Sequence, residues 1–188
     1  QPSFTNVTNT TVYVRVERTD YLPYNGTASV TITAVPLSVT AENKTVTYGD
    51  PAPVYTAGYS GFVNSENESV LGGTLSLSAS YTQGSGAGNY PIVPSGLTST
   101  NYTISFNNGT LTVNPKAATL IINNASKTYG DTDPGFTAVA GGLYGSDTLN
   151  YTLNRASGEN VGDYAIDATL GLNPNNTIYQ NGNSVSTG

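Results

Sequence analysis

Apolar and polar residues alternate with a period of two along most of the chain. In residues 29–34, Val30 and Ile32 alternate with Ser and Thr. Residues 75–79 and 104–113 show the same alternation. This period predicts β-strands that bury one face and expose the other, whereas an apolar stripe with the helical period is absent. We therefore expect an all-β protein with about half of its residues in antiparallel strands.

Three Asn-Gly pairs punctuate the alternating segments. Asn and Gly tolerate the positive φ that tight two-residue hairpin turns require. The pairs therefore predict antiparallel hairpins, and the clearest candidate is residues 102–113, in which Phe106 and Leu111 flank the turn. The three pairs are Asn25-Gly26, Asn108-Gly109 and Asn181-Gly182.

An internal repeat is the most informative feature of the sequence. Residues 43–50 (NKTVTYGD) align with residues 124–131 (NASKTYGD) at an offset of 81. Further along, Gly88-Asn89-Tyr90 aligns with Gly162-Asp163-Tyr164 at an offset of 74. The predicted divisions are N-terminal strands at residues 1–35, a first β repeat at residues 36–115, and a second β repeat at residues 116–188 that lacks its final strand.

The two ends of the chain do not form a complete repeat. Residues 20–36 have the form of residues 101–115, with which the first repeat closes. The second repeat has no clear counterpart of the strand at Leu111–Val113. Three interpretations remain open at this point: a segment of a longer tandem array, a monomer with an irregular N-terminal hairpin, and donor-strand polymerisation.

Donor-strand polymerisation would join identical subunits through their backbones. The first strands of one subunit would pair with the incomplete second repeat of its neighbour and cover sheet edges that otherwise promote aggregation. At about 25 cal/mol per Å² of apolar area, several buried side chains could contribute on the order of 10 kcal/mol before ordering costs. The side chains expected in this donated core are Val12, Val14, Val16, Val30 and Ile32.

The composition removes most of the side chains on which enzymes rely. Charged residues make up 10% of the chain, against about 25% in ordinary globular proteins, and His, Cys, Met and Trp are absent. These absences exclude a thiolate nucleophile, an imidazole general base, a Cys/His zinc site and disulfide bonds. We therefore expect a protein that is not an enzyme and needs no cofactor.

The charge balance limits the partners. The net charge is −6 and only 6 side chains are Lys or Arg, so a basic patch that could neutralise phosphates is not expected. Nucleic acid and anionic membrane surfaces are therefore not expected partners. No apolar run approaches the roughly 18 residues of a spanning helix, so we expect no membrane insertion.

Asn-X-Ser/Thr sequons occur about twice as often as chance predicts. The Asn, Ser and Thr content predicts about five sequons, and the sequence holds ten. N-glycans would hydrate a surface with few charges and would require export from the cell. Asn25 and Asn108 are the best candidates because each lies at an expected hairpin tip. The sequon asparagines are Asn6, Asn9, Asn25, Asn43, Asn67, Asn101, Asn108, Asn124, Asn150 and Asn175.

Three further features of the sequence bear on metal, loop and sugar binding. Asp131 and Asp133 are weak candidate ligands for Ca²⁺, but a calcium site needs about six to eight oxygen atoms and their spacing is not that of an EF-hand, so no metal site is expected. The Tyr-Gly-Asp runs are explained as turns in which Gly adopts a positive φ. Tyr, the main aromatic residue, is expected to cap the core, although exposed Tyr rings could also form a platform for sugars.

The repeat resembles a known family. The resemblance is to the YGD-containing MBG repeat of bacterial and archaeal cell-surface proteins, and residues 1–35 resemble the tail of a related Ig-like or MBG unit. It implies small β domains with an Ig-like sandwich or β-grasp topology, strung along secreted adhesins and surface stalks, with no catalytic residues. The runs that carry the resemblance are Tyr48-Gly49-Asp50-Pro51, Asn101-Tyr102-Thr103-Ile104, Gly109-Thr110-Leu111-Thr112-Val113 and, in the second copy, Tyr129-Gly130-Asp131.

Together these features indicate an extracellular structural protein of the cell surface. The leading hypothesis is a glycosylated filament or stalk subunit that polymerises end to end by donor-strand complementation, with identical subunits as partners. The alternative is an adhesin repeat, cut from a longer tandem array, that binds a polysaccharide, mucus or a host surface, with surface glycans as partners.

Overall fold

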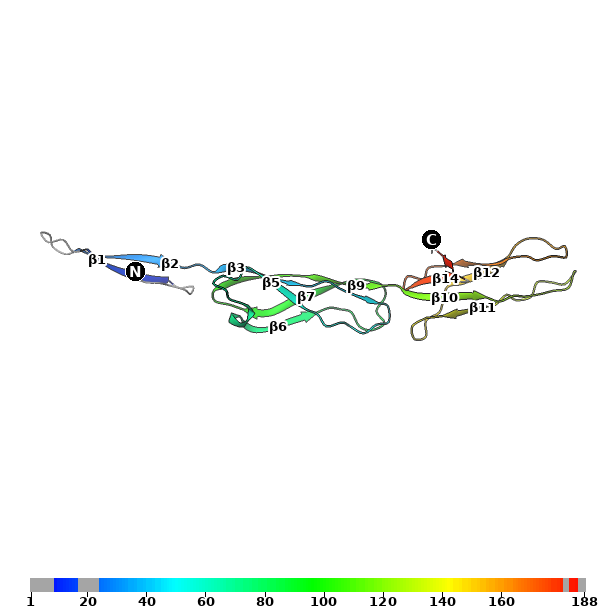
Figure 1. Cartoon of the computed structure of the whole chain (residues 1–188), viewed down its shortest axis with the longest axis horizontal. Coiled ribbons are helices and arrows are strands. Elements are labelled where there is room, and N and C mark those ends of the chain that lie inside the picture. The colour runs from blue at the N-terminus through cyan, green and yellow to red at the C-terminus, as the bar shows by residue number, and fades with distance from the viewer. Residues whose placement is uncertain (1–8, 17–23, 181–182, 186–188) are drawn as a thin grey trace. The chain divides into compact units, whose positions relative to one another are not determined.

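The protein is all-β. The computed structural model describes residues 9–16, 24–180 and 183–185 (Figure 1). Strands make up 49% of the chain, which confirms the expectation of an all-β protein with about half of its residues in strands. The only helical segment among the described residues is one 3-10 turn, η1 (Glu68–Val70), whose first N–H groups are capped by the Asn67 side chain.

The chain divides into two compact units, each assembled from separated segments. The first contains the described residues up to Glu42 together with Tyr55–Ser78 and Ile92–Gly109. The second contains Asn43–Val54, Ala79–Pro91 and the described residues from Thr110 onwards. The first sequence repeat therefore contributes segments to both units, and part of it packs together with the second repeat.

The N-terminal strands form a hairpin of their own. Strand β1 (Asn9–Val16) pairs antiparallel with β2 (Tyr24–Thr31) in a two-stranded sheet. Asn25 lies opposite Arg15 within this pairing, so Asn25-Gly26 is part of a strand. The expected hairpin tip at Asn25 is therefore wrong, because the ladder with β1 continues past the Asn-Gly pair.

The first repeat contains two sheets. One has the strand order β5-β3-β8 and the other the order β4-β9-β7-β6. The strands are β3 (Val35–Ala41), β4 (Lys44–Thr47), β5 (Ala57–Ser60), β6 (Gly72–Ser78), β7 (Gly88–Thr98), β8 (Tyr102–Asn107) and β9 (Gly109–Asn114).

Strand pairing in the first repeat is mixed. β3 pairs parallel with β8, and β4 pairs parallel with β9, while β3–β5 and β6–β7 are antiparallel. Because β8 and β9 belong to different sheets, the expected hairpin around Asn108-Gly109 is wrong. A Cβ at Gly109 would lie 2.5 Å from the Ala41 carbonyl oxygen, so only glycine lets the chain pass between the sheets at this point.

The period of two explains which residues form the core of the first repeat. β3 buries Leu37, Val39 and Ala41 and leaves the intervening side chains more exposed. β9 buries Leu111 and Val113 in the same way. Inward-facing side chains of a strand are two residues apart, so the alternation seen in the sequence is the alternation of buried and exposed positions.

The second repeat has a four-stranded sheet of order β11-β10-β14-β15 and a two-stranded sheet of β12 and β13. β14 pairs antiparallel with β15, with Gln180 opposite Asn183. The Asn181-Gly182 pair, where a hairpin turn was expected from sequence, lies outside the described residues. The strands are β10 (Lys116–Ile122), β11 (Ala138–Gly141), β12 (Tyr151–Arg155), β13 (Ile166–Leu170), β14 (Asn176–Gln180) and β15 (Asn183–Val185).

The two repeats use the same pairing in their first sheets. β10 pairs parallel with β14, as β3 pairs with β8, and Ala118 opposite Ile178 corresponds to Leu37 opposite Ile104. Ala118, Leu120, Leu149 and Ile178 form the buried cluster of the second repeat. The offsets of 81 and 74 found in the sequence are therefore structural equivalences.

Candidate functional site

The two repeats differ in their second sheets. In the first repeat, β9 lies between β4 and β7. In the second repeat, residues 125–128, the counterpart of β4, form no strand. The counterpart of β7 is β13, which pairs with β12 alone in the part of the chain that the structure describes. The place that β9 occupies in the first repeat has no strand among the described residues of the second.

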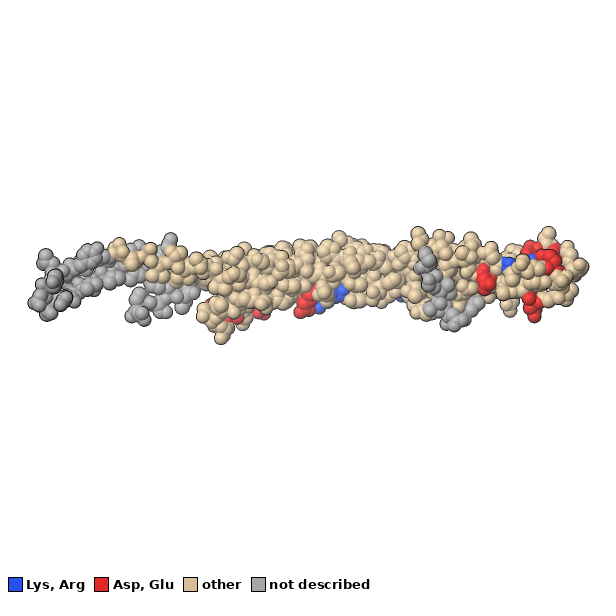
Figure 2. Space-filling view, turned by 90° about the horizontal axis from the view of Figure 1, so that it is seen from above, with Lys and Arg blue, Asp and Glu red and all other residues tan. Residues whose placement is uncertain are grey.

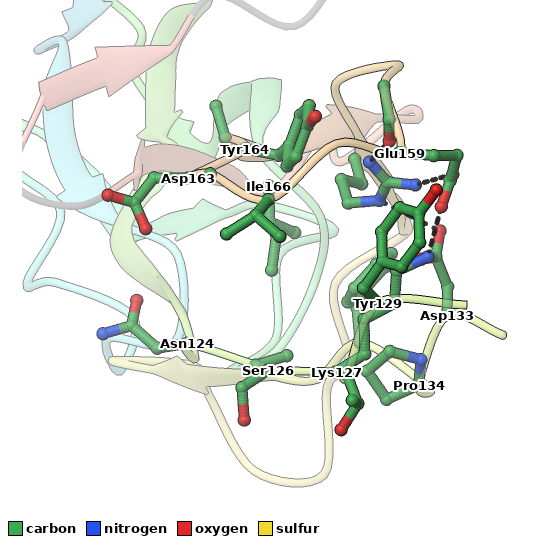
Figure 3. Close-up of a pocket in the computed structure, with 18 of the residues that line it drawn as sticks. Asn124, Ser126, Lys127, Tyr129, Asp133, Pro134, Glu159, Asp163, Tyr164 and Ile166 are labelled. Carbon is green, nitrogen blue, oxygen red and sulfur yellow. Dashed lines mark hydrogen bonds and ion pairs between the residues drawn. The ribbon is translucent and has the colours of Figure 1, made fainter. Parts of the chain in front are cut away.

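A groove lies at that place. It is a hollow of about 700 Å³, and its walls are residues 122–129 on one side and residues 158–166 on the other. Figure 3 shows Asn124 and Ser126 along one wall and Asp163 and Ile166 along the other, with open space between the two walls. These walls are the counterparts of the segments that flank β9 in the first repeat, so the groove lies where β9 lies in the first repeat. β15 follows β14 as β9 follows β8, but it pairs with β14 and not with β13.

Apolar side chains in and around the groove are more exposed than their counterparts. Ile92 is fully buried in the first repeat, whereas its counterpart Ile166 is only half-buried. Tyr48 is 4% exposed, whereas its counterpart Tyr129 is 71% exposed. Val161, which also lines the groove, is 91% exposed. Covering these side chains would be favourable, because apolar area removed from water contributes about 25 cal/mol per Å².

Four charged side chains close one end of the groove. Lys127 Nζ lies 2.8 Å from Asp133 Oδ1 and 2.7 Å from Glu159 Oε2. Arg155 Nε lies 3.0 Å from Asp133 Oδ2, and its Nη2 lies 2.7 Å from Glu159 Oε1. The Arg155 guanidinium also lies 4.9 Å from the centre of the Tyr164 ring. Figure 2 shows acidic and basic side chains at this end of the second repeat and others over the first repeat, while most of the visible surface is uncharged.

The ion pairs hold all four groups in their charged forms. Hydrogen bonds from Lys127 and then Arg155 lower the pKa of both the Asp133 and the Glu159 carboxyl groups. Hydrogen bonds to Asp133 and then Glu159 raise the pKa of the Lys127 ammonium group. A proton-transfer catalyst needs a pKa near the operating pH, and these shifts move each pKa away from neutrality. The cluster therefore acts as a set of fixed charges.

The candidate calcium ligands are not arranged as a metal site. Both carboxylate oxygens of Asp133 are bound by Lys127 and Arg155. Asp131 is exposed, and its backbone N–H donates to the Thr128 carbonyl in a turn. Within the described ranges, no group of three or more Asp, Glu, His or Cys side chains could hold an ion.

The second compact unit also contains the junction between the two repeats. Tyr48 packs edge-to-face on Tyr144, with ring centres 5.5 Å apart. A hydrogen bond to the Asp147 carboxylate, with burial next in importance, raises the pKa of the Tyr48 hydroxyl. The Ala87 N–H donates to Asn175 Oδ1 at 2.8 Å. The turn of Tyr144 and Asp147 therefore covers one end of the first repeat.

The sequon asparagines fall into three groups. Those with exposed side chains are Asn43, Asn67, Asn108, Asn124 and Asn150. Those with half-buried side chains are Asn101 and Asn175. Asn6, and the side chains of Asn9 and Asn25, lie outside the described residues, as do those of the candidate donor residues Val12, Val14 and Val16 in β1.

Several sequon side chains already have structural roles. Asn43 Oδ1 accepts from the Thr110 N–H at 2.8 Å, and Asn67 Oδ1 accepts from the Ser69 N–H at 3.0 Å. Asn175 Oδ1 is bound at the junction of the repeats. Asn124 lines the groove. Asn108 is exposed between β8 and β9, so it is the sequon best placed to carry a sugar.

Sequence reasoning missed the ion-pair cluster and the Tyr48 junction. The spacing of Arg155 and Glu159 by four residues was a local signal for one ion pair, but their contacts with Lys127 and Asp133 join distant segments. The pairing of Tyr48 with Tyr144 had no signal in the sequence at all, because it depends on how one repeat packs against the next.

Comparison with known families gives two tandem matches. Residues 37–112 and residues 118–185 each match the MBG domain (YGX type). Neither the curated proteins nor the solved structures include a significant match. No helix in the parts of the chain that the structure describes is long and apolar enough to cross a membrane.

Proposed function

Because the chain belongs to the YGX-type MBG domain family, whose repeats occur in surface-associated proteins, we propose that it is a structural subunit of an extracellular filament or stalk. Identical subunits join end to end when N-terminal strands of one copy enter the second repeat of the next. MBG repeats are structural or adhesin-type domains and are not known as enzymes, which agrees with a purely mechanical role.

The groove in the second repeat is the observation that supports this proposal. A strand fills the corresponding place in the first repeat, where Leu111 and Val113 are buried. A donated strand would bring apolar side chains to the same place and would give β13 a second neighbour. Burying a Val or Ile side chain fully contributes about 1.5 to 3 kcal/mol, and the backbone ladder supplies the direction of pairing.

The N-terminal hairpin is the source of the donated strand. Val30 in β2 is 41% exposed and Ile32, which comes directly after β2, is half-buried, so both have apolar area left to cover. The donor residues expected from sequence also include Val12, Val14 and Val16, which lie in β1. Strand addition to an open edge is a general mode of protein association.

N-glycans on the exposed sequons are a further part of the proposal. Asn108 is the first candidate acceptor because its side chain is exposed between two strands. Sugars would hydrate a surface on which only 10% of residues are charged. Mass spectrometry of glycopeptides from the native source tests this part, and an unmodified Asn108 would contradict it.

Removal of the donor strands tests the assembly. The full chain should form end-to-end filaments in negative-stain images, and a chain that lacks residues 1–34 should remain monomeric by light scattering. Urea denaturation of the shortened chain serves as the control that its repeats still fold. Filaments from the shortened chain, or a full chain that stays monomeric at high concentration, would sink the proposal.

A second candidate function is a ligand-binding adhesin repeat from a longer tandem array. The rings of Tyr129 and Tyr164 line the groove together with amide and carboxylate groups, which is the chemistry of saccharide recognition. Titration of the chain with polysaccharides, mucus glycans and host-surface glycans distinguishes the two. Saturable glycan binding by a chain that does not assemble favours the adhesin.

A further inference from the structure

We infer that the joint between two copies reproduces the junction between the two repeats of one chain. In that joint, residues 28–34 of a donor copy replace β9 in the groove of an acceptor copy. Tyr129 of the acceptor then docks on the turn Val63–Glu66 of the donor, as Tyr48 docks on the turn Tyr144–Asp147. The inference rests on the proposed function and adds a register and a second contact surface to it.

The register is set by the strand that comes next. The Val35 N–H donates to the Asn101 carbonyl at 3.0 Å, and the Lys116 N–H donates to the Asn175 carbonyl at 2.9 Å. Residue 35 therefore corresponds to residue 116, where the second repeat begins. Counting back from these two residues, Val30 takes the place of Leu111 and Ile32 takes the place of Val113, so both apolar side chains face the core.

The groove wall carries a matching hydrogen-bond acceptor. In the first repeat, Asn43 Oδ1 accepts from the Thr110 N–H on β9 at 2.8 Å. Asn124 is the counterpart of Asn43 and lines the groove. In the register above, Ser29 of the donor takes the place of Thr110, so its N–H donates to Asn124 Oδ1. Asn124 thus binds the backbone of the donated strand at one residue, Ser29.

The parallel pairing of β4 with β9 gives a further correspondence between the first repeat and the joint. β4 pairs with β9 so that Thr45 lies opposite Thr112. The counterparts in the joint are Ser126 of the acceptor and Thr31 of the donor. Residues 125–128, which are not a strand in the single chain, become one when the donor supplies the ladder.

One donor position fits less well. Ala28 takes the place of Gly109, where a Cβ would lie 2.5 Å from the Ala41 carbonyl oxygen. The corresponding carbonyl in the groove is that of Ile122, which must shift to admit the methyl group. Ala28→Gly should therefore tighten the joint.

Entry into the groove requires β2 to leave β1. β9 has a neighbour on each side, β4 and β7. β2 is paired with β1 along one of its edges in the single chain. The hairpin therefore protects the donor edge before assembly, and β1 is released when the groove takes both edges of the donated strand.

The second contact surface is defined by equivalent turns. The Asp147 N–H donates to the Tyr144 carbonyl at 3.1 Å, and the Glu66 N–H donates to the Val63 carbonyl at 3.0 Å. The second turn residue has a positive φ in both, 57° at Gly145 and 55° at Asn64. The third residue has a positive φ only in the first repeat, 60° at Ser65, so the turns share their place and hydrogen bond but differ in turn type. The turn that receives Tyr48 therefore has a counterpart in the first repeat.

The side chains of this counterpart suit a tyrosine. Val63 is 41% exposed and takes the place of Tyr144. The Glu66 carboxylate takes the place of Asp147; its Oε2 already accepts from the Tyr102 hydroxyl, so a docked tyrosine would bond to Oε1. Tyr129 is 71% exposed, and nothing lies within 4 Å of a Cβ built at Gly130, whereas one built at Gly49 would lie 2.5 Å from Tyr144. In the joint, the Tyr129 ring covers Val63 and its hydroxyl donates to Glu66.

Cysteine cross-linking tests the register, because the chain has no native Cys. The double variant Thr31→Cys/Ser126→Cys should form a covalent ladder of subunits under mild oxidation. The matched control Thr33→Cys/Ser126→Cys, shifted by two residues, should not. A ladder from the control alone overturns the register. Light scattering shows whether filaments form. Filaments whose subunits are not cross-linked refute the register, and absence of filaments refutes the proposed function itself.

Substitution of Tyr129 tests the second surface. Tyr129→Ala should weaken association by about tenfold or more, because a buried aromatic side chain at an interface is a typical hot spot. The control Leu172→Ala removes another exposed apolar side chain of the second repeat, 78% exposed, and should leave association unchanged. Urea denaturation of the monomers should show no change for either variant. Wild-type association by Tyr129→Ala would contradict the docking.

Discussion

The two repeats of this chain differ in the burial of side chains even at positions where their sequences agree. Tyr48 and Tyr129 stand in the same motif, yet the first is buried on Tyr144 and the second is 71% exposed. The strand β9 is flanked on both sides in the first repeat, and the second repeat has a groove at that place. A shared motif thus gives a shared local turn, and the burial of that turn depends on whether another segment packs against it.

The comparison also teaches how a tandem β array is stabilised. The first repeat ends in a strand that leads into the second repeat, and its Tyr48 packs on a turn of the second repeat. Repeat proteins in general derive stability from such contacts between neighbours. Four experiments test the difference between the repeats in the single chain, and they are ordered from the largest expected effect to the smallest.

Truncation of equivalent isoleucines should separate the repeats most clearly. Ile92→Ala should lower the free energy of unfolding by about 2 to 5 kcal/mol, because Ile92 is fully buried and the cavity would remain. Ile166→Ala should cost about 1 kcal/mol, because Ile166 is only half-buried beside the groove. Urea denaturation of monomeric protein measures both. Equal losses would mean that the groove is closed in solution.

Removal of the tyrosine hydroxyl from the Tyr-Gly-Asp motif should lower the free energy of unfolding in the first repeat alone. Tyr48→Phe should lower the free energy of unfolding by about 1 to 2 kcal/mol, since the Tyr48 hydroxyl is bonded to Asp147. Tyr129→Phe should have no measurable effect on the monomer, since the Tyr129 ring is exposed. Thermal denaturation followed by circular dichroism checks the pair. A similar loss of stability for Tyr129→Phe and Tyr48→Phe would contradict the difference in burial between the two tyrosines.

The paired asparagines should differ by a smaller amount. Asn43→Ala should cost about 1 kcal/mol, because it leaves the Thr110 N–H without its acceptor. Asn124→Ala should leave the monomer unchanged and should weaken assembly, if the groove receives a strand. A glycan on Asn124 would block the same groove, so glycopeptide analysis of assembled material should find Asn124 unmodified. A glycosylated Asn124 within filaments would refute its role as an acceptor.

The pH dependence of the ion-pair cluster should be the smallest effect. Because the pKa values of Asp133 and Glu159 are lowered on folding, their contribution is present above the pKa of the unfolded carboxyl groups. It is lost as the pH falls through the lower folded pKa, so the urea midpoint should fall between pH 7 and pH 3. Part of that fall should disappear in Lys127→Met, and Lys116→Met, which removes another cation of the second repeat, serves as a matched control. An unchanged pH profile in Lys127→Met would show that the cluster does not stabilise the repeat.

Local features of the fold could be predicted from the sequence. The alternation around Val30, Leu111 and Val113 predicted strands and the burial of one face, because side-chain direction in a strand depends only on the neighbouring backbone. The repeated Tyr-Gly-Asp run predicted equivalent turns, and the Thr47–Asp50 turn recurs at Thr128 and Asp131 with the same backbone hydrogen bond.

Long-range features could not be predicted in the same way. The Asn108-Gly109 pair suggested a hairpin, yet β8 and β9 pair with different strands in parallel. The expectation that the second repeat lacks a final strand stays a prediction, because β15 follows β14 but pairs with β14 and not with β13. The walls of the groove had no signal in the sequence. Lys127, Arg155 and Glu159 come together from separate segments, and nothing in their immediate neighbours encodes that approach.

The sequence by itself determined the all-β class, the tandem repeat and the face that each strand buries. Only the tertiary structure decided which strands are neighbours, that Tyr48 is covered while Tyr129 is exposed, and where the groove lies. The physical reason is that strand periodicity and turn conformation depend on neighbouring residues. Sheet order depends on hydrogen bonds between segments that are distant in the chain, and many orders are compatible with one alternating pattern.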